Sequence, residues 1–136
     1  NEGVGIAAPQ VGVNKRVIIV HVDSTNSRYK NKQRYPLTYV INPKLVSKSQ
    51  EIVDDWEGDL SCGFRAVVPR AKTCVVSGLD RNGEPVKFEL DNDFHARVFQ
   101  HEIDHLDGKF FIDHVSRYET ISEVAEWKKY WKNKKI

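Results

Sequence analysis

The chain has 136 residues, enough for one domain with a hydrophobic core and too few for two ordinary domains. Its 21 lysine and arginine residues nearly balance 19 aspartate and glutamate residues, which gives a formal charge of +2. This balance excludes a general attraction to nucleic acid or to an anionic membrane, so we expect no specific DNA partner and no membrane partner.

The cellular location follows from segments that the sequence lacks and from its cysteines. No apolar run approaches the roughly 20 residues that span a bilayer, and the first residues have no signal-peptide character. Cys62 and Cys74 are the two cysteines, too few to indicate a disulfide-stabilised secreted domain. We therefore expect a cytoplasmic protein, with an organelle matrix as the alternative.

The first third of the chain alternates apolar runs with turn residues. The β-branched residues of 16–22 predict a buried strand after the glycine-rich turn region 5–12. A polar loop is expected over 23–36. A further strand is expected over 38–46, interrupted at Asn42-Pro43 because proline cannot donate a hydrogen bond to a neighbouring strand.

A hairpin is predicted in the middle of the chain. Residues 73–78 and 85–90 are alternating runs on either side of Asn82-Gly83. Asn-Gly between two such runs is the strongest short signal for a two-stranded antiparallel hairpin.

Helical spacing occurs only in the last third. Phe94, Val98, His101 and His105 recur at intervals of three and four, after capping candidates in 91–93. Gly108 is expected to end this helix. A final helix is predicted from about Thr120, with Ile121, Val124, Trp127 and Trp131 on one stripe. Strands before helices indicate an α+β fold, with antiparallel sheets packed around one central metal-binding helix and a C-terminal helix.

A metal-binding and catalytic site is expected on the first of these helices. His101 and His105 are one helical turn apart on one face, close enough to bind a single divalent ion. Glu102 lies beside the first histidine, where a carboxylate can take a proton from water at the ion and pass it to a leaving group. A solvated polar helix with accidental spacing is the alternative, but Phe94 and Leu106 on the same helix indicate burial, which favours metal binding.

Three segments carry glycine-rich, acidic and histidine motifs in a fixed order. They are Gly3-Val4-Gly5-Ile6-Ala7-Ala8-Pro9-Gln10, Glu57-Gly58-Asp59-Leu60-Ser61 and Gln100-His101-Glu102-Ile103-Asp104-His105-Leu106. Together they resemble the three motifs of the peptide deformylase family, and the resemblance covers nearly the whole chain. It implies that residues 1–136 form a single catalytic domain that lacks the amino-terminal segment of the family.

One residue departs from the family pattern. The second motif normally has a cysteine thiolate as the third metal ligand, where this chain has Asp59. In the first interpretation Asp59 binds the ion through a carboxylate oxygen, together with His101 and His105. In the second, Cys62 swings in, although an offset of three residues on an extended segment points it to the opposite face. In the third, the change marks an inactive relative that binds metal poorly.

The resemblance also implies the remaining roles. Gln10, by its side-chain amide, and Leu60, by its backbone N–H, match the positions that stabilise negative charge on the formyl oxygen. Arg65 or Arg70 is expected to meet substrate carbonyls, although a loop arginine is more often a solvated charge. Trp56 is a further candidate for the pocket that takes the methionine side chain. The expected substrate-binding residues are Gly3, Val4, Gly5, Ile6, Phe64, Arg65 and Val98.

The function implied is removal of the formyl group from N-formylmethionyl peptides of nascent proteins. One divalent ion is expected as cofactor, natively Fe²⁺, with Zn²⁺, Ni²⁺ or Co²⁺ as substitutes. Lysines among the aromatic residues of 127–135 suggest docking on the ribosome, although tryptophans at helical spacing more often serve packing. The alternatives are a His-Glu-x-x-His metallopeptidase and a catalytically silent peptide-binding or ribosome-associated module.

Overall fold

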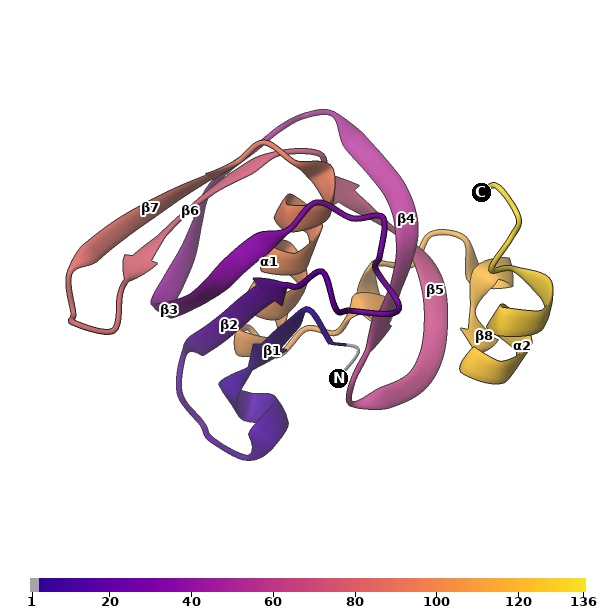
Figure 1. The fold of residues 1–136 in the computed structure, drawn as a ribbon, viewed down its shortest axis with the longest axis horizontal. Helices are drawn as coiled ribbons and strands as arrows, with labels where there is room; N and C mark the ends of the chain where they lie inside the picture. Colours follow the sequence, from indigo (N-terminus) through magenta and orange to yellow (C-terminus); the bar gives the residue numbers. More distant parts are fainter. Residues whose placement is uncertain (1–2) are drawn as a thin grey trace.

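The computed structural model describes residues 3–136 and consists of two antiparallel sheets with one long helix between them (Figure 1). The five-stranded sheet has the order β1-β2-β3-β6-β7, and its strands are β1 (Gly5–Ala7), β2 (Val17–Val22), β3 (Tyr35–Lys48), β6 (Cys74–Leu79) and β7 (Pro85–Leu90). The three-stranded sheet has the order β4-β5-β8, with β4 (Ile52–Asp59), β5 (Cys62–Ala71) and β8 (Ser122–Glu123). The helices are α1 (Asp93–Leu106) and α2 (Val124–Tyr130), with short 3-10 helices η1 (Ala8–Val11), η2 (Phe111–His114) and η3 (Tyr118–Thr120). The predicted α+β class is confirmed.

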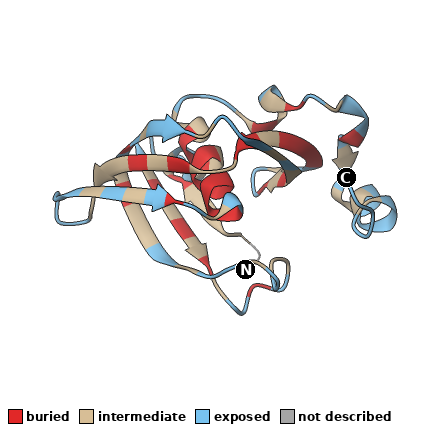
Figure 2. Cartoon of the chain, turned by 90° about the horizontal axis from the view of Figure 1, so that it is seen from above, coloured by how far each residue is buried: buried red, intermediate tan, exposed pale blue. Residues whose placement is uncertain are grey.

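The main core lies between the five-stranded sheet and α1. Strand β2 alternates buried and half-buried side chains, and Ile18, Val20 and Val22 face the helix. From the helix, Phe99 is fully buried against this face. Figure 2 shows the buried residues concentrated on α1 and on segments of the strands around it. Burial of these apolar side chains holds the helix in a fixed position between the sheets.

The predicted hairpin is present as β6 and β7, paired from Cys74 with Leu90 to Leu79 with Pro85. Gly83 in the turn has φ +80°, a conformation that glycine adopts without steric cost. The predicted interruption at Asn42-Pro43 is a register shift within a continuous β3, and Asn42 has φ +50° there. The proline therefore causes a local irregularity in the strand pairing and does not end the strand.

The N-terminus of α1 is capped by Asn92, the second of the three predicted candidates. Its side-chain oxygen accepts hydrogen bonds from the backbone N–H groups of Phe94 and His95, each at 3.1 Å. The helix ends at Leu106, and Gly108 follows with φ +70°. The boundaries expected from the sequence are therefore close to those observed.

The final helix begins later than predicted. Thr120, its expected start, is fully buried and accepts a hydrogen bond from the backbone N–H of Val67. Residues 122–123 then pair with Phe64 and Arg65 of β5. These bonds to β5 keep the backbone from forming an α-helix at residues 120–123, so α2 starts at Val124.

The tryptophans of the final helix pack inward. The ring centroids of Trp127 and Trp131 lie 6.0 Å and 5.5 Å from that of Trp56 on β4. This confirms the packing interpretation of their helical spacing. Both cysteines are free thiols. Within residues 3–136, no helix is both long enough and apolar enough to cross a membrane.

The cap of α1 provides a test of the fold. Replacing Asn92 by alanine removes the acceptor for two backbone N–H groups, so we expect a loss of about 1 kcal/mol in the free energy of unfolding. Urea denaturation followed by circular dichroism measures this loss. Asn31→Ala, in an exposed loop, is the control and should change the unfolding free energy by less than about 0.5 kcal/mol. Equal effects of the two variants would contradict the capping role.

Candidate metal and hydrolytic site

Three side chains from two elements converge where β4 ends beside α1. Asp59 is the last residue of β4, and His101 and His105 lie one turn apart on α1. One ligand atom from each of them lies within 4.8 Å of the other two. Among the residues that the structure describes, this is the group able to hold a metal ion, and its members are those expected from the sequence.

Cys62 does not belong to this group. It pairs with Asp59 across the turn between β4 and β5, and it is packed against a small core under β5 that includes Phe111 and Val115. The geometry therefore supports Asp59 over Cys62 as the third ligand.

The carboxylate of Asp59 is bound on both of its oxygens. Oδ2 lies 2.8 Å from Nε2 of His101 and 2.6 Å from Nε2 of His105. Oδ1 accepts hydrogen bonds from the backbone N–H of Ser61 at 2.6 Å and from Nε2 of Gln10 at 3.0 Å. Burial alone would raise the pKa of Asp59, but the hydrogen bonds from His101, His105 and Ser61 hold the pKa well below its usual range.

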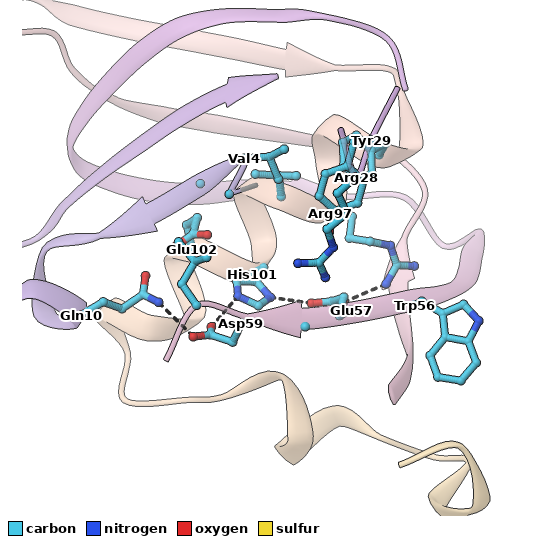
Figure 3. Close-up of a pocket in the computed structure, with 16 residues that line it drawn as sticks. Val4, Gln10, Arg28, Tyr29, Trp56, Glu57, Asp59, Arg97, His101 and Glu102 are labelled. Atoms are coloured by element: carbon cyan, nitrogen blue, oxygen red, sulfur yellow. Dashed lines mark hydrogen bonds and ion pairs between the residues drawn. The ribbon is translucent and has the colours of Figure 1, made fainter. Parts of the chain in front are cut away.

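His101 is oriented from its other side by Glu57. Nδ1 of His101 lies 2.7 Å from Oε1 of Glu57, so that Nε2 points to Asp59 (Figure 3). A carboxylate on the second ring nitrogen is the usual means of fixing a ligating histidine. Burial by itself would lower the pKa of His101, but the hydrogen bonds that it donates to Asp59 and Glu57 raise the pKa to about 10.

Two buried arginines neutralise Glu57. Arg70 donates to both of its carboxylate oxygens, at 2.9 and 3.0 Å, and Arg97 donates to Oε2 at 2.8 Å. All three side chains are at most 5% exposed. Burial alone would raise the pKa of Glu57, but the bonds from His101 and Arg70 lower it to about 2. Arg70 also pairs with Asp104, so the structure assigns it to a buried ion-pair network rather than to substrate carbonyls.

Glu102 is buried beside the two histidines and carries a carboxylate oxygen without a partner. It is 4% exposed, and its Oε2 has no hydrogen-bond partner among residues 3–136. Burial raises its pKa to about 7, with His101 and His105 opposing the rise. A carboxyl group with this pKa can accept and return a proton near neutral pH, as a general acid–base requires.

Gly5 provides the space for Glu102. A Cβ atom built on Gly5 would lie 2.6 to 2.9 Å from three atoms of the Glu102 side chain. Strand β1 and α1 can approach so closely only because residue 5 has no side chain.

A pocket of about 50 Å³ opens beside these groups. Of the expected residues, it is lined by Gly3, Val4, Gly5, Gln10, Trp56, Asp59, Leu60, Val98, His101 and Glu102. Figure 3 shows Val4, Gln10 and Glu102 around it together with Asp59 and His101. Residues that the sequence interpretation missed also line it, namely Arg28, Tyr29, Glu57, Gly58, Phe94 and Arg97.

Three expected substrate-binding residues lie outside this pocket. Ile6 lines a neighbouring groove with Leu37 and Leu60. Phe64 is 41% exposed on β5 and faces Glu123 of β8 in the strand pairing. Arg65 is buried, with its guanidinium 5.5 Å from the ring centroid of Trp127. Phe64 and Arg65 thus lie beside the C-terminal segment, while the guanidinium of Arg65 also lies against Gly58 of the pocket wall. Their roles toward substrate stay predictions.

The missed residues had different signals in the sequence. Glu57 stands in the second motif, two residues before Asp59, and this spacing on one strand could have placed both on the same face. Arg97 lies four residues before His101 on α1, which could have indicated a partner for a buried carboxylate. Arg28 and Tyr29 lie in a polar loop with no periodic pattern, and no sequence signal places them at the site.

Comparison with known proteins decides the family. A family model described as polypeptide deformylase matches residues 1–120. The chain belongs to the peptide deformylase family. It is 50% identical over 123 residues to peptide deformylase 2 of Nostoc sp., covering 89% of this chain and 68% of the relative. It is 37% identical over 129 residues to the peptide deformylase of Rickettsia akari, covering 94% of this chain and 73% of the relative.

Solved peptide deformylase structures have the same fold. A Met-Ala-Ser-bound class I type b peptide deformylase from Acinetobacter baumannii is 40% identical, with a TM-score of 0.78, covering 83% of this chain and 70% of that chain. The peptide deformylase from Ehrlichia chaffeensis is 36% identical, with a TM-score of 0.75, covering 88% and 69%. The resemblance inferred from the three motifs is thereby confirmed.

The buried network around Glu57 can be tested through stability. Glu57→Gln removes the charge that neutralises Arg70 and Arg97, and breaking one partner of a buried ion pair costs about 3 kcal/mol or more. We therefore expect a loss of this size in the free energy of unfolding, measured by urea denaturation. Glu84→Gln, at an exposed hairpin turn, is the matched control and should be nearly neutral. A neutral Glu57→Gln would contradict the role assigned to this network.

Proposed function

We propose that the protein is a metal-dependent peptide deformylase that removes the formyl group from N-formylmethionyl peptides of nascent proteins. The observation that carries the proposal is the convergence of Asp59, His101 and His105 beside a pocket, with the unpartnered carboxylate oxygen of Glu102 next to them. The family matches support the same activity.

The donor set fits a divalent ion. Two imidazole nitrogens and one carboxylate oxygen are a set that Fe²⁺ and Zn²⁺ accept, with room for water as a further ligand. Such an ion would supply Lewis-acid chemistry, polarising the formyl carbonyl and making water a stronger nucleophile at neutral pH. We expect Fe²⁺ natively, with Zn²⁺, Ni²⁺ or Co²⁺ as substitutes. Asp59, His101 and His105 would hold it.

The protein's own groups complete the reaction. Glu102 takes a proton from the attacking water and returns it to the departing amine, in keeping with a pKa near 7. The Leu60 backbone N–H and the Gln10 side-chain amide are proposed to stabilise negative charge on the formyl oxygen. Gln10 would keep its hydrogen bond to Asp59 and exchange the one to Ser61 Oγ for a hydrogen bond to that oxygen. Leu60 and Gln10 both line the pocket.

The substrate would lie along β1. This strand is at the edge of its sheet and, within the described part of the chain, pairs with β2 alone, so its other side can bind an extended peptide as an added strand. Gly3, Gly5 and Ile6 lie on this strand or next to it. Val4 and Val98 line the adjoining pocket, where a methionine side chain would bury its apolar surface.

Two finer expectations belong to this proposal. The named relatives include bacterial deformylases and a chloroplastic one from tomato, which agrees with a cytoplasmic location or an organelle matrix. The lysines of residues 128–135 extend from the C-terminal helix and could meet ribosomal RNA. Since Trp127 and Trp131 pack on Trp56, such docking would depend on charge rather than on stacking.

Turnover of formyl-Met-Ala-Ser by metal-loaded protein tests the proposal directly. We expect Glu102→Gln to lower kcat by roughly 10²- to 10⁴-fold, because it removes the proton acceptor but none of the three expected ligands. Elemental analysis of the variant should still find one ion per chain.

The alternatives give different results in the same assay. Cleavage of unformylated peptides would indicate a metallopeptidase. Metal binding without turnover of the formyl peptide would refute the deformylase proposal, and absence of metal binding would indicate a silent module. Chelation should abolish activity, and addition of Fe²⁺, Ni²⁺ or Co²⁺ should restore it.

The close approach at Gly5 gives a second prediction. In Gly5→Ala the new methyl group would overlap Glu102, so the carboxylate must move. We expect kcat to fall at least about tenfold, because a proton acceptor displaced by about 1 Å loses its alignment. Zn²⁺ affinity, measured by competition with a chromogenic chelator, should change little.

Gly63→Ala is the matched control for this variant. A Cβ built on Gly63 meets nothing within 4 Å, and its φ is not in the left-handed region. It should keep its kcat. If both variants lost the same activity, displacement of Glu102 would not be the cause.

A further inference from the structure

The two carboxylate oxygens of Asp59 have separate sets of partners. Among residues 3–136, the hydrogen-bond partners of Oδ2 are the two imidazoles, at 2.8 and 2.6 Å. Oδ1 is turned away from them and accepts from the Ser61 backbone N–H and from Gln10 Nε2. The side chain of Asp59 is fully buried, so these contacts, rather than water, satisfy it. The carboxylate therefore joins the proposed ligand set to a second group of residues.

Gln10 is fixed by three hydrogen bonds. Its Oε1 accepts from the backbone N–H of Ala7 at 2.8 Å, and its Nε2 donates to Asp59 Oδ1 and to Ser61 Oγ, each at 3.0 Å. The orientation of the amide follows from chemistry, because an ionised carboxylate can only accept. Both N–H bonds of the amide are thus directed at residues 59 and 61.

A side chain with one ligand atom could not bind the ion and accept the Gln10 hydrogen bond through separate atoms. A carboxylate has two oxygens with about four acceptor sites, so one oxygen can face a cation while the other accepts hydrogen bonds. A thiolate has only its sulfur for both purposes. The contact between Gln10 and Asp59 Oδ1 is consequently a property of aspartate at this position.

We propose that Asp59 is a divided ligand, in which Oδ2 binds the ion and Oδ1 positions the amide of Gln10. The inference rests on the proposed function only for the role of Gln10 toward substrate. The coupling is reciprocal, since Gln10 and the Ser61 N–H hold Oδ1 and leave Oδ2 alone to face the histidines. Metal affinity should therefore depend on Gln10 when residue 59 is aspartate, although Gln10 is not itself a ligand.

A double-mutant cycle on metal affinity tests this coupling without substrate. Dissociation constants for Zn²⁺ would be measured by chelator competition for the wild-type protein, Gln10→Ala, Asp59→Cys and the double variant. We expect Gln10→Ala to weaken binding about tenfold in the wild-type background, the usual size for a residue that orients a ligand. In the Asp59→Cys background the same change should weaken binding less than about twofold. The bond to Ala7 is lost in both backgrounds and cancels in the cycle.

Ser61→Ala and Gln50→Ala are control variants that separate the coupling between Gln10 and Asp59 from general effects on packing. Ser61→Ala removes the other acceptor of the Gln10 amide but keeps the backbone N–H that bonds Asp59 Oδ1. Gln50 is exposed and does not line the pocket. Both variants should leave the Zn²⁺ dissociation constant within about twofold of wild type.

Equal losses for Gln10→Ala in both backgrounds would overturn the proposal, as would a tenfold loss in Ser61→Ala. If Asp59→Cys fails to fold, a second measurement tests the proposal. It compares the visible absorption of Co²⁺ bound to the wild-type protein with that of Co²⁺ bound to Gln10→Ala. Release of Oδ1 should change the bands, whereas identical spectra with identical affinities would refute the divided ligand. Deformylase turnover is a separate readout, so coupling without turnover would refute the proposed function and leave this inference standing.

Discussion

The arrangement of the site depends on one buried charge, the carboxylate of Glu57. A buried carboxylate is tolerated only when it is neutralised and hydrogen-bonded, and Glu57 meets both conditions through Arg70 of β5, Arg97 of α1 and His101. Because Glu57 lies on β4 and its partners lie on β5 and α1, satisfying the charge also sets the position of α1 relative to the β4–β5 hairpin. The same bonds aim Nε2 of His101 at Asp59. The ligand geometry is therefore a consequence of how the core charge is paired.

Much of the fold could be predicted because the signals are local. The β6–β7 hairpin follows from Asn82-Gly83 between alternating runs, and α1 follows from its apolar spacing and its cap at Asn92. The final helix was placed too early because the buried hydroxyl of Thr120 and the pairing of 122–123 with β5 are tertiary effects. Such contacts override helical spacing and leave no local pattern.

The site was predictable to the extent that motif spacing sets geometry. Two histidines one turn apart on a helix must share a face, and Asp59 was expected beside them from its place in the second motif. The network of Arg97 with Glu57 was not expected, because it joins residues 40 positions apart in sequence. Phe64 and Arg65 were expected at the substrate from the motif pattern, and no local sequence pattern indicated that they pair with residues 122–123 of β8.

The shortness of β1 limits how many residues of a peptide substrate the enzyme could recognise. Gly5–Ala7 is a strand of only three residues, so an added peptide could form main-chain bonds over no more than its first few residues. Recognition through the main chain is indifferent to side-chain identity. The rest of a growing polypeptide would extend beyond the sheet edge and make no contact with β1. An enzyme that acts on nascent peptides of differing sequence needs this tolerance, and here it would come from a strand too short to select among side chains.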